Sequence, residues 1–253
     1  MVGGDWSAIG GKFCNEYIDP MLSCLIDKLA TALPGQCAVC HAWPAQPVCE
    51  TCVGRFAQPE ERCRRCAIPV MQGVTECGHC LSAPPALDSC HAAVNYAYPW
   101  STLIGQYKFN GHAGWARGFA TLMRSAPWVE PSLEQADVML PMPLSAKRLS
   151  ERGFNQALLL ARALSPAKTQ PSLLLRVRHT SAQTALDRKE RLANVEGAFG
   201  VDPLRANEVR GKKVLLVDDV MTSGASLFSA AAAVRQAGAS SVGAVVFART
   251  DDK

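Results

Sequence analysis

Eight cysteines lie between Cys37 and Cys80, and each of them belongs to a C-x-x-C pair. The pairs are Cys37 and Cys40, Cys49 and Cys52, Cys63 and Cys66, and Cys77 and Cys80. A C-x-x-C turn directs two thiolates at one metal ion, and two such turns complete a tetrahedral sulfur site. The cysteines therefore predict two closed zinc sites, which are structural because no coordination position stays open. Metal binding would supply the free energy that this small module cannot draw from its own core.

The sequence leaves the grouping of these ligands open. A sequential arrangement puts the first two pairs on one zinc ion and the last two on the other, whereas a cross-braced arrangement interleaves them. Iron–sulfur clusters use the same thiolate ligands and are an alternative to zinc. A thioredoxin-like redox role is only weakly indicated, because it needs one C-x-x-C pair rather than four in tandem.

A second chemical motif lies at residues 214–226, which read VLLVDDVMTSGAS. A predicted buried strand ends in Asp218 and Asp219, and small residues follow from Thr222 to Ser226 before a predicted helix. Backbone N–H groups at a helix start, together with hydroxyl groups, can hold a phosphate, and Gly224 lets the backbone approach the anion. The two acids beside this loop could hold sugar hydroxyls or act through a bound metal ion.

Basic side chains gather in two parts of the sequence. Arg62, Arg64 and Arg65 surround Cys63, where they would compensate the charge of zinc-bound thiolates or form a nucleic-acid patch. Residues 147–191 hold 10 lysines and arginines against three acids, a balance of +7. This stretch is either a solvated basic face or an anion-binding surface, because the phosphates of a small ligand and of DNA attract the same side chains.

The elements that would position these residues alternate after residue 90. Apolar runs predict strands at residues 93–98, 137–141, 173–177, 213–219 and 241–248. Helices are expected at residues 100–109, 114–125, 154–164 and 225–237, with a polar loop after residue 141. Continuous apolar strands separated by helices predict an α/β fold, in which helices cover both faces of a parallel sheet.

Three segments are expected along the chain. Residues 1–36 contain an amphipathic helix at 21–33, which would pack on the next module or lie on a membrane surface. Residues 37–81 form the cysteine module. A Pro-containing joint at residues 82–90 then leads to a domain at residues 91–253.

Composition narrows the class of protein. The chain has 253 residues, of which 48% are hydrophobic and 19% charged, as in a folded soluble protein. No apolar run approaches the roughly 20 residues that span a bilayer, and no signal peptide is expected at the N-terminus. The net charge of +4 excludes a histone-like role. An odd total of 11 cysteines without a secretory signal indicates a reducing compartment, so we expect a cytoplasmic protein.

The segment at 214–226 closely resembles the 5-phosphoribosyl 1-pyrophosphate (PRPP) motif of type I phosphoribosyltransferases. In that family the acids bind the ribose hydroxyls and the loop binds the 5′-phosphate. The resemblance implies that Asp218 and Asp219 bind the ribose. It also assigns PRPP contacts to the residues that follow, which are Val220, Met221, Thr222, Ser223, Gly224, Ala225 and Ser226. The implied fold is a parallel sheet flanked by helices, with a variable hood.

Two further segments extend the resemblance to most of the chain. Residues 141–156 read PMPLSAKRLSERGFNQ, and residues 178–199 read RHTSAQTALDRKERLANVEGAF. Both are similar to the ComF family, which comprises competence protein F and the GntX-like proteins. That family joins an N-terminal double zinc ribbon to a phosphoribosyltransferase domain. It is associated with the uptake and use of external DNA in bacteria.

The resemblance also implies roles for basic and polar residues. Lys147 and Arg148 would lie in the pyrophosphate loop, with Arg152 and Asn155 at the following helix start. A segment like the mobile loop of the family carries Gln183, Arg188, Arg191 and Asn194, and Lys108 matches a lysine early in the domain. The catalytic set would then be Asp218, Asp219, Lys147, Arg148 and Arg188. Mg²⁺ is expected with PRPP.

Two functions stay open on the sequence. The first is a phosphoribosyltransferase with an unknown acceptor, since no base-recognition motif is found at residues 82–112. The second is a sensor or scaffold that binds PRPP and single-stranded DNA. Other DNA-uptake proteins are expected partners, a homodimer is left open, and stable membrane insertion is not expected. A general nucleotide-salvage enzyme is disfavoured by the missing base motif.

Overall fold

The computed structural model describes residues 35–43, 45–109, 112–177 and 197–251. The chain divides into two compact units, residues 1–49 and residues 50–253. The described part of the first unit has an isolated antiparallel bridge between Gly35 and Ala45 and carries the first three cysteines of the module.

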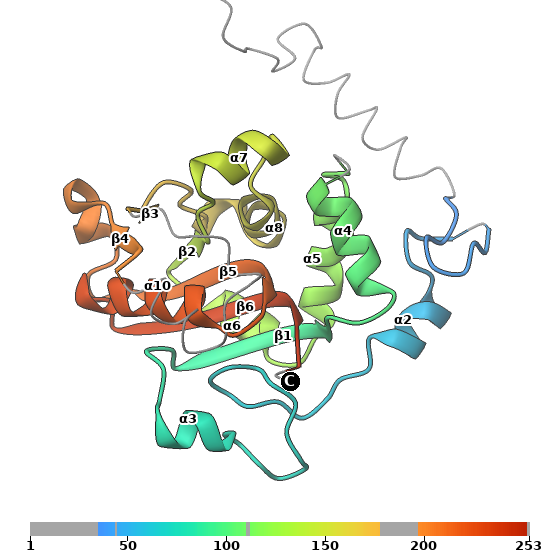
Figure 1. Ribbon diagram of the computed structural model, residues 1–253, viewed down its shortest axis with the longest axis horizontal. Coiled ribbons are helices and arrows are strands. Elements are labelled where there is room, and N and C mark those ends of the chain that lie inside the picture. Colours follow the sequence, from blue (N-terminus) through green and yellow to red (C-terminus); the bar gives the residue numbers. More distant parts are fainter. Residues whose placement is uncertain (1–34, 44, 110–111, 178–196, 252–253) are drawn as a thin grey trace, which may run out of the picture. The chain divides into compact units, whose positions relative to one another are not determined.

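The second unit alternates helices and strands (Figure 1). Its described helices are α2 (Glu50–Phe56), α3 (Gly78–Ser82), α4 (Trp100–Phe109), α5 (Trp115–Ser125), α6 (Val129–Gln135), α7 (Ala146–Arg152), α8 (Gln156–Leu164) and α10 (Ala225–Gln236). Its described strands are β1 (Ser89–Asn95), β2 (Val138–Pro141), β3 (Leu174–Arg176), β4 (Phe199–Val201), β5 (Lys213–Met221) and β6 (Ser241–Arg249). Its described residues also form two short 3₁₀ helices, η1 (Pro166–Lys168) and η3 (Pro203–Glu208).

Strands β1, β6, β5 and β2 form a parallel sheet in that order. In its register Val217 of β5 lies opposite Pro141 of β2 and Val245 of β6. The central strands β5 and β6 are buried over most of their length, because their apolar side chains point to both covered faces. Since parallel strands end at the same edge, the residues that follow β2, β5 and β6 come together there.

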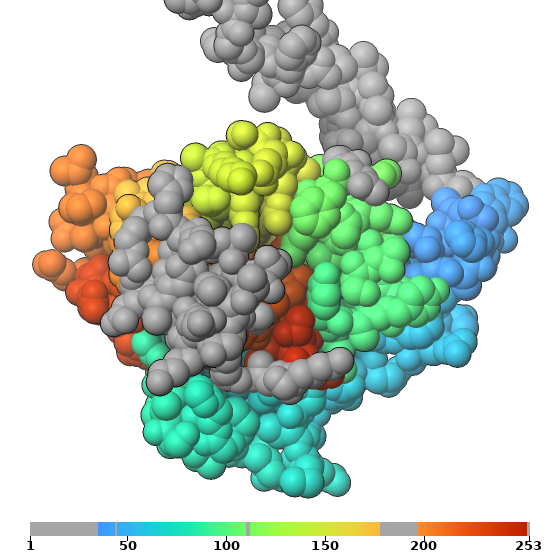
Figure 2. Space-filling view, in the orientation of Figure 1, coloured from blue at the N-terminus to red at the C-terminus, as the bar shows by residue number. Residues whose placement is uncertain are grey.

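Helices cover both faces of the sheet. On one face α10 buries Leu227, Ala230 and Val234, which share one stripe of the helix. Side chains alternate along a strand, so Phe247 of β6 points to the other face. There it stacks on Phe119 of α5 with ring centroids 4.0 Å apart, and α5 packs against α8. Figure 2 shows the yellow-green α7 beside the green α4, where Cζ of Arg152 lies 5.2 Å from the ring centroid of Phe109. The predicted α/β fold with a flanked parallel sheet is confirmed.

The second half of the cysteine module packs into the core of the sheet. Cys63, Cys66 and Cys80 share one buried cluster with Cys90 of β1. The backbone N–H of Cys90 donates to the carbonyl of Arg64 over 2.7 Å. The compact second unit therefore begins ahead of the Pro-containing joint, and the segment bounds derived from the sequence stay predictions.

Helix α7 occupies part of the region that the sequence predicted as a polar loop, and that prediction was wrong. The side-chain oxygen of Ser145 accepts a hydrogen bond from the N–H of Arg148 and caps the helix. Gly153, with φ of +77°, ends it. None of its residues is buried, so the hydrophobic pattern carried no sign of a helix.

The predicted strand at residues 173–177 forms, as β3, but outside the main sheet. It pairs antiparallel with β4, and Arg176 lies opposite Phe199. The first predicted strand is also shifted, because β1 begins at Ser89. An apolar run indicates that a strand exists, whereas its pairing partner depends on how the rest of the chain packs.

Some sequence predictions fall outside the described residues. These are the helix at 21–33 and the loop residues Gln183, Arg188, Arg191 and Asn194. Among the residues that the structure does describe, every helix is too short or too polar to cross a bilayer.

Candidate functional site

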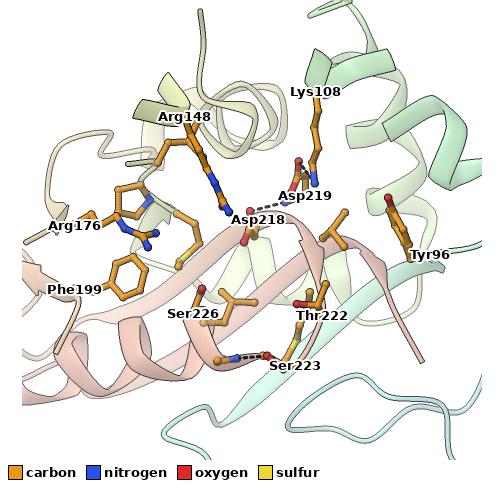
Figure 3. Close-up of a pocket in the computed structure, with 18 of the residues that line it drawn as sticks. Tyr96, Lys108, Arg148, Arg176, Phe199, Asp218, Asp219, Thr222, Ser223 and Ser226 are labelled. Atoms are coloured by element: carbon orange, nitrogen blue, oxygen red, sulfur yellow. Dashed lines mark hydrogen bonds and ion pairs between the residues drawn. The ribbon is translucent and has the colours of Figure 1, made fainter. Parts of the chain in front are cut away.

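A cavity of about 470 Å³ opens at the carboxyl ends of β2 and β5 (Figure 3). The end of β5, the loop after it and the first turn of α10 form one side, and the loop after β2 forms another. The lining residues are Tyr96, Lys108, Met142, Pro143, Leu144, Arg148, Arg152, Arg176, Phe199 and Asp218–Leu227. Ligands of open α/β sheets bind at this edge of the sheet.

The acid pair lies at the end of β5 and borders the cavity. Asp219 is buried, and its Oδ2 lies 3.2 Å from Nζ of Lys108 in α4. The backbone N–H of Asp219 donates to Oδ1 of Asp218 over 2.9 Å. Burial, and then the neighbouring charge of Asp219, raise the pKa of Asp218 to about 7. The pair therefore presents carboxylate oxygens that hydroxyl groups or a cation of a ligand could satisfy.

The raised pKa of Asp218 predicts a pH-dependent stability. Between its ordinary pKa of 3.8 and about 7, the unfolded chain ionises this group while the folded chain keeps it protonated. The free energy of unfolding should therefore fall as pH rises through that window, by about 1.4 kcal/mol per pH unit relative to Asp218→Asn. Urea unfolding of both proteins from about pH 5.5 to about pH 8 measures the difference. Parallel pH profiles would contradict the raised pKa.

The loop between β5 and α10 is tight around Gly224. This glycine has φ of +79°, and a Cβ atom there would lie 2.5 Å from Cε of Met221 and 2.6 Å from Cζ of Phe228. Ser223 is buried, and its Oγ accepts a hydrogen bond from the N–H of Ala225 over 3.4 Å. The first N–H groups of a helix have no acceptor within the helix, and those of α10 border the cavity. The geometry suits a phosphate group.

Replacing Gly224 with Ala should destabilise the protein more than replacing Gly211. Gly211 has a similar φ of +71° but open space around its missing Cβ, so it isolates the conformational cost of about 1–2 kcal/mol. Gly224→Ala adds the overlap with Met221 and Phe228, which should cost at least about 1 kcal/mol more. Urea unfolding of the two variants measures this difference. Equal losses would show that the loop is not packed as described.

Cationic side chains reach the cavity from α7. The guanidinium of Arg148 points from this helix toward Asp218 (Figure 3). Arg152 is held by its neighbours, because its Nη1 donates to Oε1 of Gln156 over 2.9 Å and its Cζ lies 5.2 Å from the ring centroid of Phe109. With Lys108, these side chains surround the acid pair with positive charge that an anionic ligand could use.

Two residues expected at the site do not line the cavity. Lys147 is 83% exposed, and its Nζ lies 3.9 Å from Oε1 of Glu151. Consecutive residues of a helix point about 100° apart, so α7 turns Arg148 inward and Lys147 outward. Asn155 caps α8, since its Oδ1 accepts from the N–H of Leu158, and its Nδ2 donates to the carbonyl of Met142 over 3.0 Å. Asn155 thus fixes the loop after β2 from behind.

The cavity also contains residues that the sequence analysis missed, among them Tyr96, Arg176 and Phe199. Cζ of Arg176 lies 5.4 Å from the ring centroid of Phe199, and burial lowers the pKa of this arginine. Arg176 falls within the basic stretch at 147–191, which was a usable signal. Phe199 reaches the cavity through its pairing with β3, for which the sequence carried no signal.

The eight cysteines gather into two tetrads. Cys37, Cys40, Cys49 and Cys52 form the first and Cys63, Cys66, Cys77 and Cys80 the second, with the sulfur atoms of each within 4.8 Å of one another. This is the sequential grouping. Burial opposes ionisation of Cys37, but the N–H groups of Cys40 and Cys49 lower its pKa to about 6. Both tetrads fit a tetrahedral zinc ion with four thiolates.

Acids within the second half of the cysteine module pair with its arginines. Glu76 lies 2.5 Å from Nη2 of Arg64 and 3.1 Å from Nε of Arg65. Hydrogen bonds from these two arginines lower the pKa of Glu76. Arg62 lies 3.6 Å from Glu60. These ion pairs partly neutralise the three arginines that the sequence analysis considered as a nucleic-acid patch.

Comparison with known proteins matches a phosphoribosyl transferase domain at residues 155–253. Competence protein F of Haemophilus influenzae is 33% identical over 183 residues, which cover 70% of this chain and 79% of that protein. This chain belongs to the competence protein F family. The resemblance read from the sequence is confirmed.

Two other relatives of this chain have names that also refer to competence or to the use of DNA. The DNA utilization protein YhgH of Salmonella typhimurium is 28% identical over 227 residues, which cover 86% of this chain and 98% of that protein. Competence protein ComFC of Bacillus subtilis is 32% identical over 135 residues, 53% of each chain. The domain match contains the acid pair and the loop at residues 222–226, which we call the phosphate loop, whereas Lys108 and Arg148 come from the chain ahead of it.

Proposed function

We propose that this protein binds PRPP in the cavity at the end of β5 and transfers its phosphoribosyl group to an acceptor during the use of external DNA. The observation that carries the proposal is the common cavity of Asp218, Asp219 and the phosphate loop. A ligand that carries a sugar, a phosphate and a pyrophosphate requires three kinds of group in its site. The acids suit the sugar, the tight loop suits the phosphate, and the cations suit the pyrophosphate. The domain match at residues 155–253 supports the same class of ligand.

Each part of PRPP has a complementary part of the cavity. Asp218 and Asp219 would accept hydrogen bonds from the ribose hydroxyls. The N–H groups and hydroxyls of residues 222–226 would hold the 5′-phosphate. Arg148 and Lys108 would face the pyrophosphate, whose charge grows as the C1′–O bond breaks. The pyrophosphate leaves with the electron pair of that bond, and the acceptor forms a bond to C1′ and gives up a proton.

Mg²⁺ is the expected companion of PRPP. The oxygen atoms of the acid pair are the donors that Mg²⁺ prefers, so the acids that would face the ribose could also hold such an ion. Bound there, Mg²⁺ would neutralise part of the pyrophosphate charge.

Isothermal titration calorimetry with PRPP tests the proposal. We expect saturable binding that Mg²⁺ strengthens, and competition by inorganic pyrophosphate because it occupies the same cations. Ribose 5-phosphate is the matched control, since it reaches the acids and the loop but not the pyrophosphate side chains, and it should bind more weakly. Absence of PRPP binding with and without Mg²⁺ would refute the proposal. A screen for pyrophosphate release over candidate acceptors then tests turnover.

The DNA role rests on the names of relatives, which include competence protein F and DNA utilization protein. We propose DNA-uptake proteins and single-stranded DNA as partners, and a cytoplasmic location, which suits both PRPP and reduced cysteines. DNA binding should weaken with salt at a slope of about −0.7 per neutralised phosphate. Fluorescence anisotropy with and without saturating PRPP measures the binding of DNA. No binding at low salt would refute single-stranded DNA as a partner, and only the transferase role would then stand.

A further inference from the structure

Arg249 is a fully buried cation at the end of β6. Its side chain is 0% exposed, although arginine is rarely buried unless it is paired. Its Nε donates to the carbonyl of Cys66 over 2.9 Å, and its Nη1 donates to the carbonyl of Thr222 over 2.5 Å. One guanidinium therefore joins the backbone of a cysteine in the second tetrad to the first residue of the phosphate loop.

A second contact joins the same two regions. The thiol of Cys90 lies 3.6 Å from Sδ of Met221, the last residue of β5 before the loop. Cys90 in turn donates its backbone N–H to the carbonyl of Arg64, between Cys63 and Cys66. The turn that carries Cys63 and Cys66 is thus connected to two consecutive residues, to Met221 through Cys90 and to Thr222 through Arg249.

The chemistry of the tetrad favours a cation at this place. Four thiolates and one Zn²⁺ ion leave a formal charge of about −2. A buried guanidinium costs free energy unless charge and hydrogen bonds compensate it. The planar fork of arginine can donate in two directions at once, which the compact ammonium of lysine cannot do at this spacing.

We infer that Arg249 is a positioning residue that holds the phosphate loop in its binding conformation, and that metal in the second tetrad fixes the loop through it. The effect on ligand binding rests on the proposed PRPP function. The conformation of the loop itself does not, so the two can be measured separately.

Arg249→Lys tests the role of the fork while it keeps the charge. Arg62→Lys is the matched control, because Nη1 of Arg62 also donates to the same cysteine turn, at the carbonyl of Ala67, but its Nη2 bonds Asn95 instead of the loop. Hydrogen–deuterium exchange at residues 222–226 should rise in Arg249→Lys and stay unchanged in Arg62→Lys. PRPP affinity should fall about tenfold in Arg249→Lys only, the size expected for one charge-assisted hydrogen bond.

Cysteine variants test the metal without touching the arginine. Cys77→Ser removes a ligand of the second tetrad, and Cys40→Ser removes one of the first. Elemental analysis should find one zinc ion fewer in each, but only Cys77→Ser should raise exchange at residues 222–226. In the Arg249→Lys background, Cys77→Ser should add less loosening than it does alone, because only the contact through Cys90 then still joins the tetrad to the loop.

The outcomes separate the two proposals. Unchanged loop exchange in Arg249→Lys would overturn the positioning role, and unchanged exchange in Cys77→Ser would overturn its dependence on metal. If Arg249→Lys does not fold, the comparison of Cys77→Ser with Cys40→Ser still decides the coupling. Raised exchange in a protein that binds no PRPP would support the coupling and refute the proposed function.

Discussion

Replacing Asp218 and Asp219 together with asparagine is expected to weaken PRPP binding at least about a hundredfold, because each carboxylate would lose a charge-assisted bond of about 1.5–3 kcal/mol to the ribose. Asparagine keeps the size of the side chain. It also removes the free-energy cost of burying a charged carboxylate. That cost is the main reason why the pKa of Asp218 is raised. Asp219→Asn also removes the carboxylate that pairs with Lys108, so thermal unfolding followed by circular dichroism checks that the double variant is folded. Calorimetry with Mg²⁺ and PRPP measures the affinity.

Asp137→Asn is the matched control for this double variant. Asp137 precedes β2, at the opposite end of the sheet from the cavity, and its Oδ2 accepts a hydrogen bond from the N–H of Lys213 over 2.9 Å. An asparagine there should leave the PRPP affinity unchanged. Unchanged affinity in the Asp218 and Asp219 variant would refute the assignment of the acid pair, whatever the control does.

Zinc removal should have the largest effect on stability. The two tetrads predict about two zinc ions per chain. Zinc can contribute on the order of 10 kcal/mol to the folding of a small module. A substitution that empties the second tetrad should lower the melting temperature by at least about 10 °C, because Cys63, Cys66 and Cys80 share the core cluster of the sheet. Elemental analysis and thermal unfolding followed by circular dichroism measure both quantities.

Cys80→Ser and Cys40→Ser form the comparison. Cys80 is fully buried in the second tetrad, whereas Cys40 is exposed in the first. Each variant should retain one zinc ion, and Cys80→Ser should melt at the lower temperature. A single zinc ion in the unaltered protein would contradict the two-site interpretation, and iron in place of zinc would contradict the choice of metal.

The parts of the site that are contiguous in the chain could be predicted from the sequence. Asp218 and Asp219, Gly224 and the start of α10 follow one another within a few residues, so a buried strand, an acid pair, a tight loop and a helix start were visible together. The cysteine pairs were visible for the same reason. The structure then showed that the tetrads are sequential and not cross-braced.

The positions that depend on packing could not be predicted in the same way. Helix α7 has no buried residue, so no periodicity revealed it, and its presence decides that Arg148 faces the cavity and Lys147 faces solvent. β3 was expected as a strand, but its antiparallel partner β4 brings Phe199 to the cavity.

The sequence by itself determined the α/β class, the phosphate loop and the number of cysteine tetrads. Each of these features depends on residues that are close together in the chain, and the types of those residues limit the local backbone and chemistry. Only the tertiary structure decided that Arg249 joins Cys66 to Thr222. These three residues are far apart in the chain. The pairing of β5 with β6 places Arg249 near Thr222, and packing of the cysteine turn against the sheet brings Cys66 to Arg249. Local sequence patterns carry the geometry of single elements, whereas contacts between elements depend on how the whole core packs.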